Sequence, residues 1–294
     1  MRVTQSMLTS NMLKNLSRSF EKLAKYQDQL SSQKKITRPS DDPVVAMKGI
    51  SYRRHLQEVV QYKRNFSEAY NWLDQSDAAL DKAGKALQRI RELLVQASND
   101  TYDEQQRVSI SEEIVQLREH LAEIANTKVG DKYLFNGTNT LERPVNLETE
   151  PVTVSTNGKP VQIELSKGIY ITVNVKPQDV FSEDLFHDIE GLALALNDEN
   201  ADGELLSGFL EKIDRHRNNV LNARADLGAR VNRVEMMEQR IEEQETLATK
   251  MMSDNEDVDF EKVVTDLLAQ ESAHRAALAA GARIMQSTLM DFLR

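Results

Sequence analysis

The sequence predicts a mainly α-helical protein, an elongated antiparallel helical bundle or coiled-coil rod built from both chain ends, with a small inserted α+β domain. Two uninterrupted heptad repeats and a change of pattern between them predict this fold, because a strict seven-residue repeat indicates a supercoiled packing seam. The first repeat runs through Val45, Tyr52, Val59, Phe66, Leu73, Leu80, Leu87 and Leu94. The second runs through Leu206, Ile213, Val220, Leu227, Val234, Ile241 and Ala248.

The chain begins with an amphipathic segment, residues 3–34. Its apolar residues recur at steps of three, four and seven, which predicts one apolar helix face. They are Leu13, Leu16, Phe20, Leu23 and Leu30. The sequence TRPSDDPVV then interrupts the helix. Asp42 followed by Pro43 predicts an N-cap and the first position of a new helix. If that helix is continuous over residues 45–94, it is roughly 75 Å long, which indicates a rod.

A third helix is predicted at about residues 104–127, folding back antiparallel on the second because the connection is short. After Gly130 the chain is rich in turns, and VTVS, VQIEL and IYITVNV then alternate apolar and polar residues as strands do. Asn157-Gly158 predicts a hairpin between the first two of these strands. Ser182 is expected to cap a short helix.

The second heptad helix is expected to end at SDNEDVD, and a last helix to occupy about residues 258–293. Its apolar positions are Val263, Leu267, Leu278, Ile284 and Leu289. Residues 1–40 contain eight Lys and Arg against two acids, whereas residues 254–294 contain four against eight. Opposite charge favours pairing of the two amphipathic ends.

Three parts follow from these patterns. Terminal helices comprise residues 1–40 and 258–294, and a long helical rod comprises residues 41–136 and 201–257. The third part is an inserted β-rich domain at 137–200.

Composition excludes several classes of protein. The formal net charge is −10, which argues against a general nucleic-acid binder, and the lack of cysteine excludes disulfides, zinc–cysteine sites and thiol catalysis. No apolar run is long enough to span a bilayer. The N-terminus has no signal-peptide core or cleavage site, so we expect any export to use another route.

Enzymatic and metal-binding hypotheses find little support. No histidine lies in an HExxH spacing, and Glu271 with His274 forms one Glu-x-x-His where a di-iron bundle needs two, so surface placement is favoured. The acidic run from Asp254 to Asp259 lacks the central glycine of a calcium loop and is better explained as a helix break with an acidic first turn. We expect no catalytic, cofactor or metal site.

Two features allow more than one interpretation. The basic N-terminal face could contact a membrane or nucleic acid, but pairing with the acidic C-terminal segment is favoured, so neither partner is expected. The alanine-rich AALAAGA allows close helix approach in a packed tube, yet alanine is also the best helix former. If the tube interpretation holds, the ends become ordered only when neighbouring subunits cover them.

Several motifs resemble those of the flagellin-like axial proteins of the bacterial flagellum, in the right order and with a variable segment between them. The resemblance covers residues 1–137 and 205–294. It is carried by LSSQKKITRPSDDPVVAMKG, LDQSDAALDKAGKALQRIRELLVQASNDT, LREHLAEIANTKVGDKYLFNGT, ADLGARVNR and STLMDFLR. RPSDDP, KYLFNGTNT and the DFLR ending are more similar to the junction members of this family than to flagellins.

The resemblance implies a non-enzymatic adapter ring between the neighbouring hook-associated protein and flagellin, on the outside of the cell. It implies an inner tube of terminal helices, a surrounding shell of long helices and an outward-projecting central domain. It also implies type III export with a cytoplasmic export chaperone. The alternatives are a flagellin, which forms the filament, or a cytoplasmic coiled-coil scaffold.

The residues expected to form the self-assembly and partner interface are the apolar positions of both terminal helices. They are Leu13, Leu16, Phe20, Leu23, Leu30, Val263, Leu267, Leu278, Ile284 and Leu289.

Overall fold

The computed structural model describes residues 5–98, 104–149, 152–198 and 203–292. Its helices are α1 (Gln5–Ser32), α2 (Pro43–Ala97), α3 (Glu104–Ala125), α4 (Pro177–Val180), α5 (Glu183–Leu196), α6 (Gly203–Glu256) and α7 (Phe260–Phe292). Two compact units divide the chain: a terminal unit, residues 1–58 with 244–294, and a central unit, residues 59–243. Among the described residues, no helix combines the length and apolar character needed to cross a membrane.

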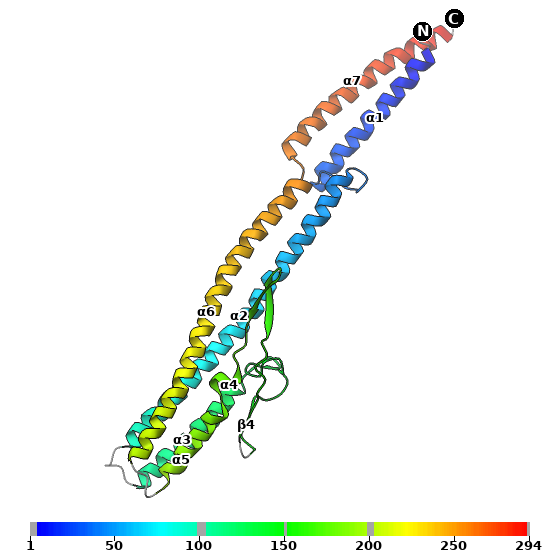
Figure 1. Ribbon diagram of the computed structural model, residues 1–294. Coiled ribbons are helices and arrows are strands. Elements are labelled where there is room, and N and C mark those ends of the chain that lie inside the picture. Colours follow the sequence, from blue (N-terminus) through cyan, green and yellow to red (C-terminus); the bar gives the residue numbers. More distant parts are fainter. Residues whose placement is uncertain (1–4, 99–103, 150–151, 199–202, 293–294) are drawn as a thin grey trace. The chain divides into compact units, whose positions relative to one another are not determined.

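In the central unit, α2 and α6 run antiparallel and side by side (Figure 1). Residue numbers rise along one helix as they fall along the other, as four polar contacts show. These are Tyr70 with Glu238, Asp77 with Arg224, Gln88 with Arg217 and Arg91 with Asp214. Two helices from opposite ends of the sequence therefore pair, as predicted.

The heptad repeats form the seam of this pair. All their members in the central unit, from Val59 to Leu94 and from Leu206 to Ile241, are at most 2% exposed. A second set of α2 residues, each three positions after a heptad residue, is also fully buried. This set is Ala69, Ser76 and Ala83. Large side chains therefore alternate with small ones along the buried face of α2.

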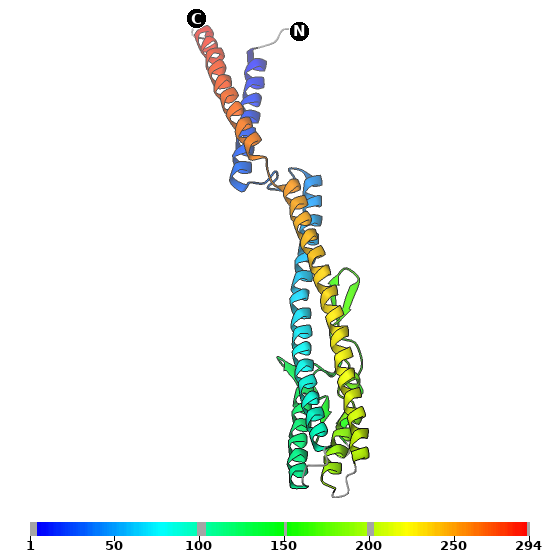
Figure 2. The same cartoon turned by 90° about the vertical axis from the view of Figure 1, so that its left-hand side faces the viewer.

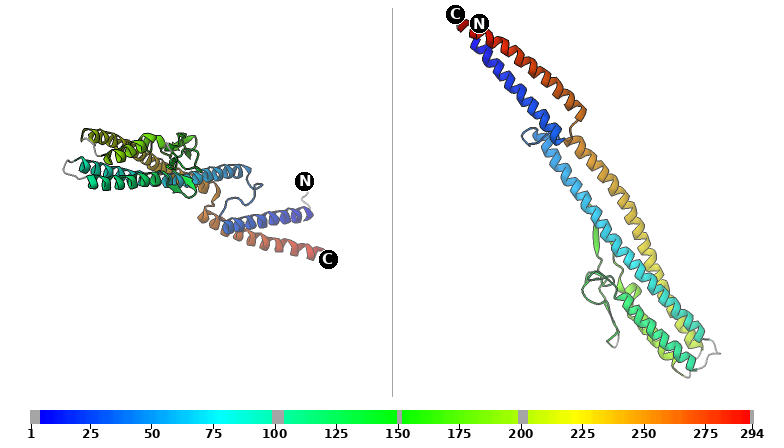
Figure 3. Two further views of the ribbon diagram at one scale, coloured as in Figure 1. Left: turned by 90° about the horizontal axis from the view of Figure 1, so that it is seen from below. Right: turned by 180° about the vertical axis from the view of Figure 1, so that it is seen from behind.

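Helices α3 and α5 complete a four-helix bundle (Figure 3). Arg89 of α2 pairs with Glu113 of α3, which confirms that α3 folds back on α2. The Ser111 hydroxyl of α3 donates to the Ala193 carbonyl of α5, a buried hydrogen bond of 2.9 Å. The predicted caps are also present, since Asp42 accepts from the amides of Val44 and Val45 and Ser182 accepts from Leu185.

The strands pair differently from the prediction. They form three antiparallel two-stranded sheets. The pairs are β1 (Lys128–Val129) with β2 (Lys132–Tyr133), β3 (Val145–Asn146) with β4 (Thr153–Val154), and β5 (Gln162–Ser166) with β6 (Ile169–Thr172).

The hairpin predicted at Asn157-Gly158 is therefore wrong, because the strands on its two sides pair with β3 and β6 instead. The Asn157 side chain accepts from the Lys159 amide and donates to the Asn136 carbonyl, so it holds a loop rather than a two-residue turn. The turn that joins β5 to β6 contains Gly168, whose φ is +73°.

In the terminal unit, α1 and α7 lie side by side and antiparallel (Figure 2). The Ser19 hydroxyl accepts from Gln270 at 2.9 Å and lies 3.1 Å from Nδ1 of His274, whose ring is 6.3 Å from that of Phe20. The two ends pair as expected. However, no ion pair joins the described residues of α1 to those of α7, because the cations of α1 (Lys14, Arg18, Lys22 and Lys25) are exposed.

Candidate assembly surfaces

The terminal unit buries few of its described apolar side chains. Among its described residues, the only buried hydrophobic ones are Ala248 and Val263, whereas the central unit holds the entire hydrophobic core cluster. Its large exposed hydrophobic residues are Met7, Leu13, Phe20, Val44, Met47, Ile50, Leu247, Met251, Phe260, Leu268 and Leu278. These exposed apolar residues are the candidate assembly surface of the described chain.

The predicted stripe of α1 divides into two rows. Leu16, Leu23 and Leu30 are half-buried and lie on the face that packs against α7. Leu13 and Phe20 are 62% and 66% exposed, and the Phe20 ring lies at the edge of the contact, 6.3 Å from that of His274 on α7. One row therefore contributes to the α1–α7 pair, and the other remains available to a partner.

The predicted residues of α7 divide in a similar way. Val263 is buried, Leu267 is half-buried and Leu278 is 48% exposed. The side chains of Ile284 and Leu289 lie outside the described part of the chain. The predicted set is thus distributed over inner and outer faces rather than gathered on one surface.

The α1–α7 contact also contains polar and small residues, which an apolar periodicity in the sequence does not reveal. They are Ser19 on α1 and Gln270, His274 and Gly281 on α7, with Gly281 in contact with Met12. The surface placement expected for His274 is wrong, since its ring is half-buried against α1. Their heptad spacing could have revealed them. One heptad register on α7 runs through residues 263, 267, 270, 274, 277 and 281.

A second polar contact joins α5 to α6 in the central unit. Asp188, with its side chain 13% exposed, accepts from Lys212 at 2.8 Å and lies 2.9 Å from Nε2 of the buried His216. Burial raises the pKa of Asp188, but the hydrogen bonds with Lys212 and His216 outweigh it, so the pKa lies below its ordinary value. The charged form of Asp188 therefore helps to hold α5 on α6.

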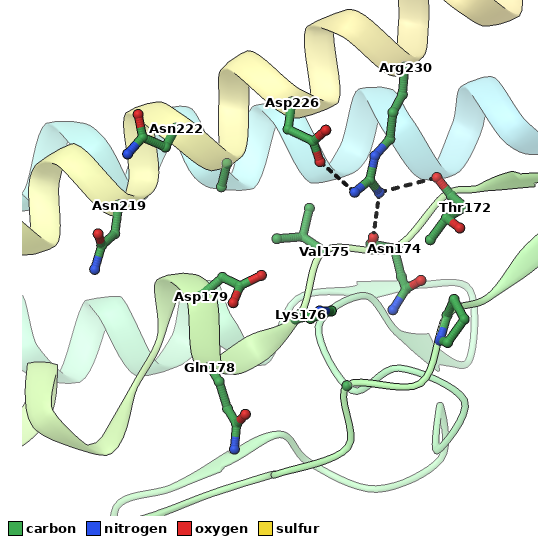
Figure 4. Close-up of a pocket in the computed structure, with 13 residues that line it drawn as sticks. Thr172, Asn174, Val175, Lys176, Gln178, Asp179, Asn219, Asn222, Asp226 and Arg230 are labelled. Atoms are coloured by element: carbon green, nitrogen blue, oxygen red, sulfur yellow. Dashed lines mark hydrogen bonds and ion pairs between the residues drawn. The ribbon is translucent and has the colours of Figure 1, made fainter.

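A cavity of about 570 Å³ lies between α6 and the segment around α4. As Figure 4 shows, Arg230 reaches from α6 to the backbone carbonyls of Thr172 and Asn174 and also pairs with Asp226. This contact fastens the end of β6 to the bundle. Among the described residues, no three His, Asp or Glu side chains are grouped so that they could hold a metal ion.

Two family models match the chain. The bacterial flagellin N-terminal helical region matches residues 3–140, and the bacterial flagellin C-terminal helical region matches residues 210–293. Together they cover well over half of the chain, including all of α1 to α3 and α7. The unmatched segment contains β3, β4, β5, β6, α4 and α5.

Relatives match over the whole length. Flagellar hook-associated protein 3 of Escherichia coli (strain K12) is 27% identical over 95% of this chain and 96% of its own. Flagellin of Bacillus subtilis (strain 168) is 26% identical over 100% of both chains. The crystal structure of the flagellar junction protein FlgL from Legionella pneumophila shares the fold, with a TM-score of 0.60 and 16% identity over 71% of this chain and 100% of that one. The chain therefore belongs to the flagellin-like family of structural proteins of the bacterial flagellum.

Proposed function

We propose that the chain is an adapter subunit, copies of which form a ring that joins the hook-associated proteins to the flagellin filament. The observation that carries this proposal is the contrast between the two units. The central unit hides its own core, whereas the terminal unit leaves large apolar side chains uncovered. The central unit has its own buried core, and the terminal helices leave apolar side chains exposed. Such a subunit suits head-to-tail assembly into rings and tubes.

The interface we propose consists of the apolar positions of α1 and α7 named above. Leu13, Phe20 and Leu278 face partners directly, and Leu16, Leu23, Leu30, Val263 and Leu267 hold the helix pair that presents them. Ile284 and Leu289 are included from helical spacing alone. Covering one such Leu or Phe side chain stabilises an assembly by about 1.5–3 kcal/mol, so a few per subunit offset the cost of association.

The terminal helices, the long helical rod and the inserted domain each have a different position in the proposed flagellar assembly. In this proposal residues 1–40 and 258–294 line an inner tube, and residues 41–136 and 201–257 form the surrounding shell. Residues 137–200 project outward. The family match at both ends, with an unmatched segment between them, supports this division.

The proposed partners are further copies of the chain, a neighbouring hook-associated protein, flagellin and a cytoplasmic export chaperone. The protein is exported through the flagellar type III apparatus and acts outside the cell. It makes and breaks no bond, and it requires neither a cofactor nor contact with nucleic acid or membrane.

A flagellin is the second candidate, because the Bacillus subtilis flagellin is nearly as similar as the hook-associated relative. The two functions differ in whether added subunits continue to polymerise. Purified flagellin added to filament seeds lengthens them, whereas a junction subunit adds a single ring and the seeds grow no further. Measured seed lengths in the electron microscope therefore separate the two candidates.

The deciding experiment removes the gene and then restores variants. A strain without the gene is expected to keep its hooks, release flagellin into the medium and lack filaments. Restoring Leu13→Ser with Phe20→Ser should leave this defect in place, although the purified variant unfolds at the same denaturant concentration as the native chain. Leu221→Ser, at a position of the central unit that is 52% exposed, is the matched control and should restore filaments. Normal filaments in the deletion strain would refute the proposal.

A further inference from the structure

The sequence contains two Asn-Gly dipeptides, Asn136-Gly137 at the start of the inserted segment and Asn157-Gly158 within it. Asparagine before glycine is prone to deamidation, because glycine has no Cβ to hinder attack by its amide nitrogen on the preceding side chain. In this reaction the glycine nitrogen bonds to Cγ of the asparagine, the Cγ–Nδ2 bond breaks, and Nδ2 leaves as ammonia with the proton of the glycine amide. Water then opens the succinimide to aspartate or isoaspartate. The fold brings these two reactive sites into contact.

The side chain of Asn136 is engaged at both of its polar atoms. Asn136 is only 1% exposed. Its Oδ1 accepts from the Ser155 hydroxyl, and its Nδ2 donates to the Glu142 carbonyl at 2.9 Å. Attack by the Gly137 nitrogen requires this side chain to turn toward its own backbone, which breaks both buried hydrogen bonds. Deamidation at Asn136 therefore requires the loop to open.

The side chain of Asn157 is bonded directly to the other site. Its Nδ2 donates to the Asn136 carbonyl at 3.2 Å and to the Thr138 hydroxyl at 3.3 Å. Its Oδ1 accepts from the Lys159 amide at 3.2 Å. The intact amide of Asn157 thus supplies the hydrogen bonds that join the two loops.

Asn157 is nevertheless the less protected of the two asparagines. The attacking group is engaged, since the Gly158 amide donates to the Thr156 carbonyl at 2.9 Å. However, Asn157 and Gly158 are only half-buried, whereas Asn136 is fully buried. A smaller opening of the chain therefore exposes Asn157 to reaction.

Close packing also couples the two sites. A Cβ at Gly137 would lie 2.5 Å from the carbonyl oxygen of Asn157 and 2.9 Å from that of Lys159, so the second loop is folded tightly over the first glycine. The Ser155 hydroxyl, which donates to Asn136, also accepts from the Asn157 amide at 3.2 Å. A change at one site is therefore transmitted to the other.

We propose that Asn157 is the deamidation site of the folded chain and that its intact amide protects Asn136, so that loss of the first amide speeds loss of the second. Deamidation replaces the Nδ2 donor of Asn157 by a carboxylate oxygen, which only accepts hydrogen bonds. This oxygen faces the Asn136 carbonyl, another acceptor, so the contact becomes repulsive and the loop opens. The proposal concerns the inserted segment alone and is independent of the adapter function.

The first test compares deamidation in the folded full-length chain with that in the chain unfolded by urea, at one mildly alkaline pH, by peptide mass spectrometry. In urea both sites should react at similar rates. Folding should slow Asn157 at least about tenfold and Asn136 by more, because both reactions require local opening. Equal rates in the folded and unfolded chains, or faster loss at Asn136 than at Asn157 in the folded chain, would overturn the proposal.

The second test removes the hydroxyl that the two sites share. Ser155→Ala deletes the donor to Asn136 and the acceptor of the Asn157 amide. It should speed deamidation at both sites about fivefold, the effect expected from one lost hydrogen bond. Ser166→Ala, in β5 of the same segment, is the matched control and should leave both rates unchanged. Native rates in a Ser155→Ala chain that unfolds in urea like the native one would contradict the shared protection.

The third test measures the coupling itself. Asn157→Asp reproduces one product of the first deamidation and should speed the loss of the Asn136 amide at least about fivefold, because a donor is replaced by a charged acceptor. Asn219→Asp adds the same charge at an exposed position of α6 and should leave the Asn136 rate at its native value. If Asn136 reacts at the native rate in Asn157→Asp as well, the two sites are independent and the proposed protection is refuted.

Discussion

At Gly137 the backbone φ is +52°, and a Cβ would lie 2.5 Å from the carbonyl oxygen of Asn157. Gly137 follows the buried Asn136, whose side chain donates to the Glu142 carbonyl. The motif LFNGT thus closes the loop of the inserted segment on itself. At the scale of single residues, a glycine is required there by both backbone conformation and lack of space.

Replacement of Gly137 by alanine should destabilise the central unit far more than replacement of Gly130. Both glycines have a positive φ, but nothing lies within 4 Å of a Cβ at Gly130. We expect Gly130→Ala to cost about 1 kcal/mol, and Gly137→Ala at least about 2 kcal/mol more, because a backbone atom must also move. Urea unfolding measures both, and equal losses would refute the steric explanation.

Asp188 should make stability depend on pH. Its folded-state pKa is below the unfolded value of about 3.9, so its contribution is present above that value and is lost as pH falls through the folded pKa. Asp188→Asn should lose about 1–3 kcal/mol at pH 7 and show a flatter decline in acid. Urea unfolding at pH 7 and near pH 3 tests this, with Asp184→Asn as the exposed control on the same helix. Parallel pH profiles for native and Asp188→Asn proteins would contradict it.

At the scale of elements, two helix pairs with the same heptad geometry differ in their side chains. The α2–α6 seam of the central unit is made of Leu, Val, Ile and Phe and is fully buried. The α1–α7 seam contains Ser19, Gln270 and His274 and is half-buried. The first pair therefore contributes to the stability of one subunit, and the second is stable enough only with support.

Truncation in the α2–α6 seam should therefore be costly. Leu80 is fully buried, so Leu80→Ala removes apolar contacts and leaves a cavity, at a cost of about 2–5 kcal/mol. Leu221→Ala, on the exposed side of α6, should stay within about 0.5 kcal/mol of the native chain. Guanidinium unfolding gives both values, and a Leu80→Ala loss as small as that of Leu221→Ala would show that the seam does not hold the bundle.

At the scale of the whole molecule, stability is distributed unevenly between the two units. Almost all buried apolar side chains of the described chain lie in the central unit, and local opening is easiest where few such contacts exist. The terminal unit is therefore the part whose order depends most on partners. This uneven distribution suits a subunit that must change its surroundings when it assembles.

Amide exchange across the free chain should follow this distribution. Amides of α1 and α7 should exchange much faster than those of residues 73–94. On incorporation into flagella, α1 and α7 should become protected while the bundle changes little. Equal protection of α1 and of residues 73–94 in the free chain would contradict the proposed dependence on partners.

Sequence patterns predicted the elements better than their polar contacts. The heptads located α2 and α6, and cap residues located the starts of α2 and α5, because both signals are local or strictly periodic. The hairpin at Asn157-Gly158 was wrong, since strand pairing is chosen by non-local partners such as β3. His274 and the buried His216 were missed because a polar residue in a helical seam interrupts the apolar pattern that reveals the seam.

The sequence by itself determined the helical class, the pairing of opposite chain ends and the resemblance to flagellin-like proteins, because a seven-residue repeat and ordered motifs are written in the chain. Only the tertiary structure decided which apolar residues stay exposed, which strands pair, and that Glu256 is buried against Gly49 and Arg53. The physical reason is that burial and charge pairing depend on residues that are far away in the sequence. Lys34 and Asp257, which form an ion pair, are 223 positions apart.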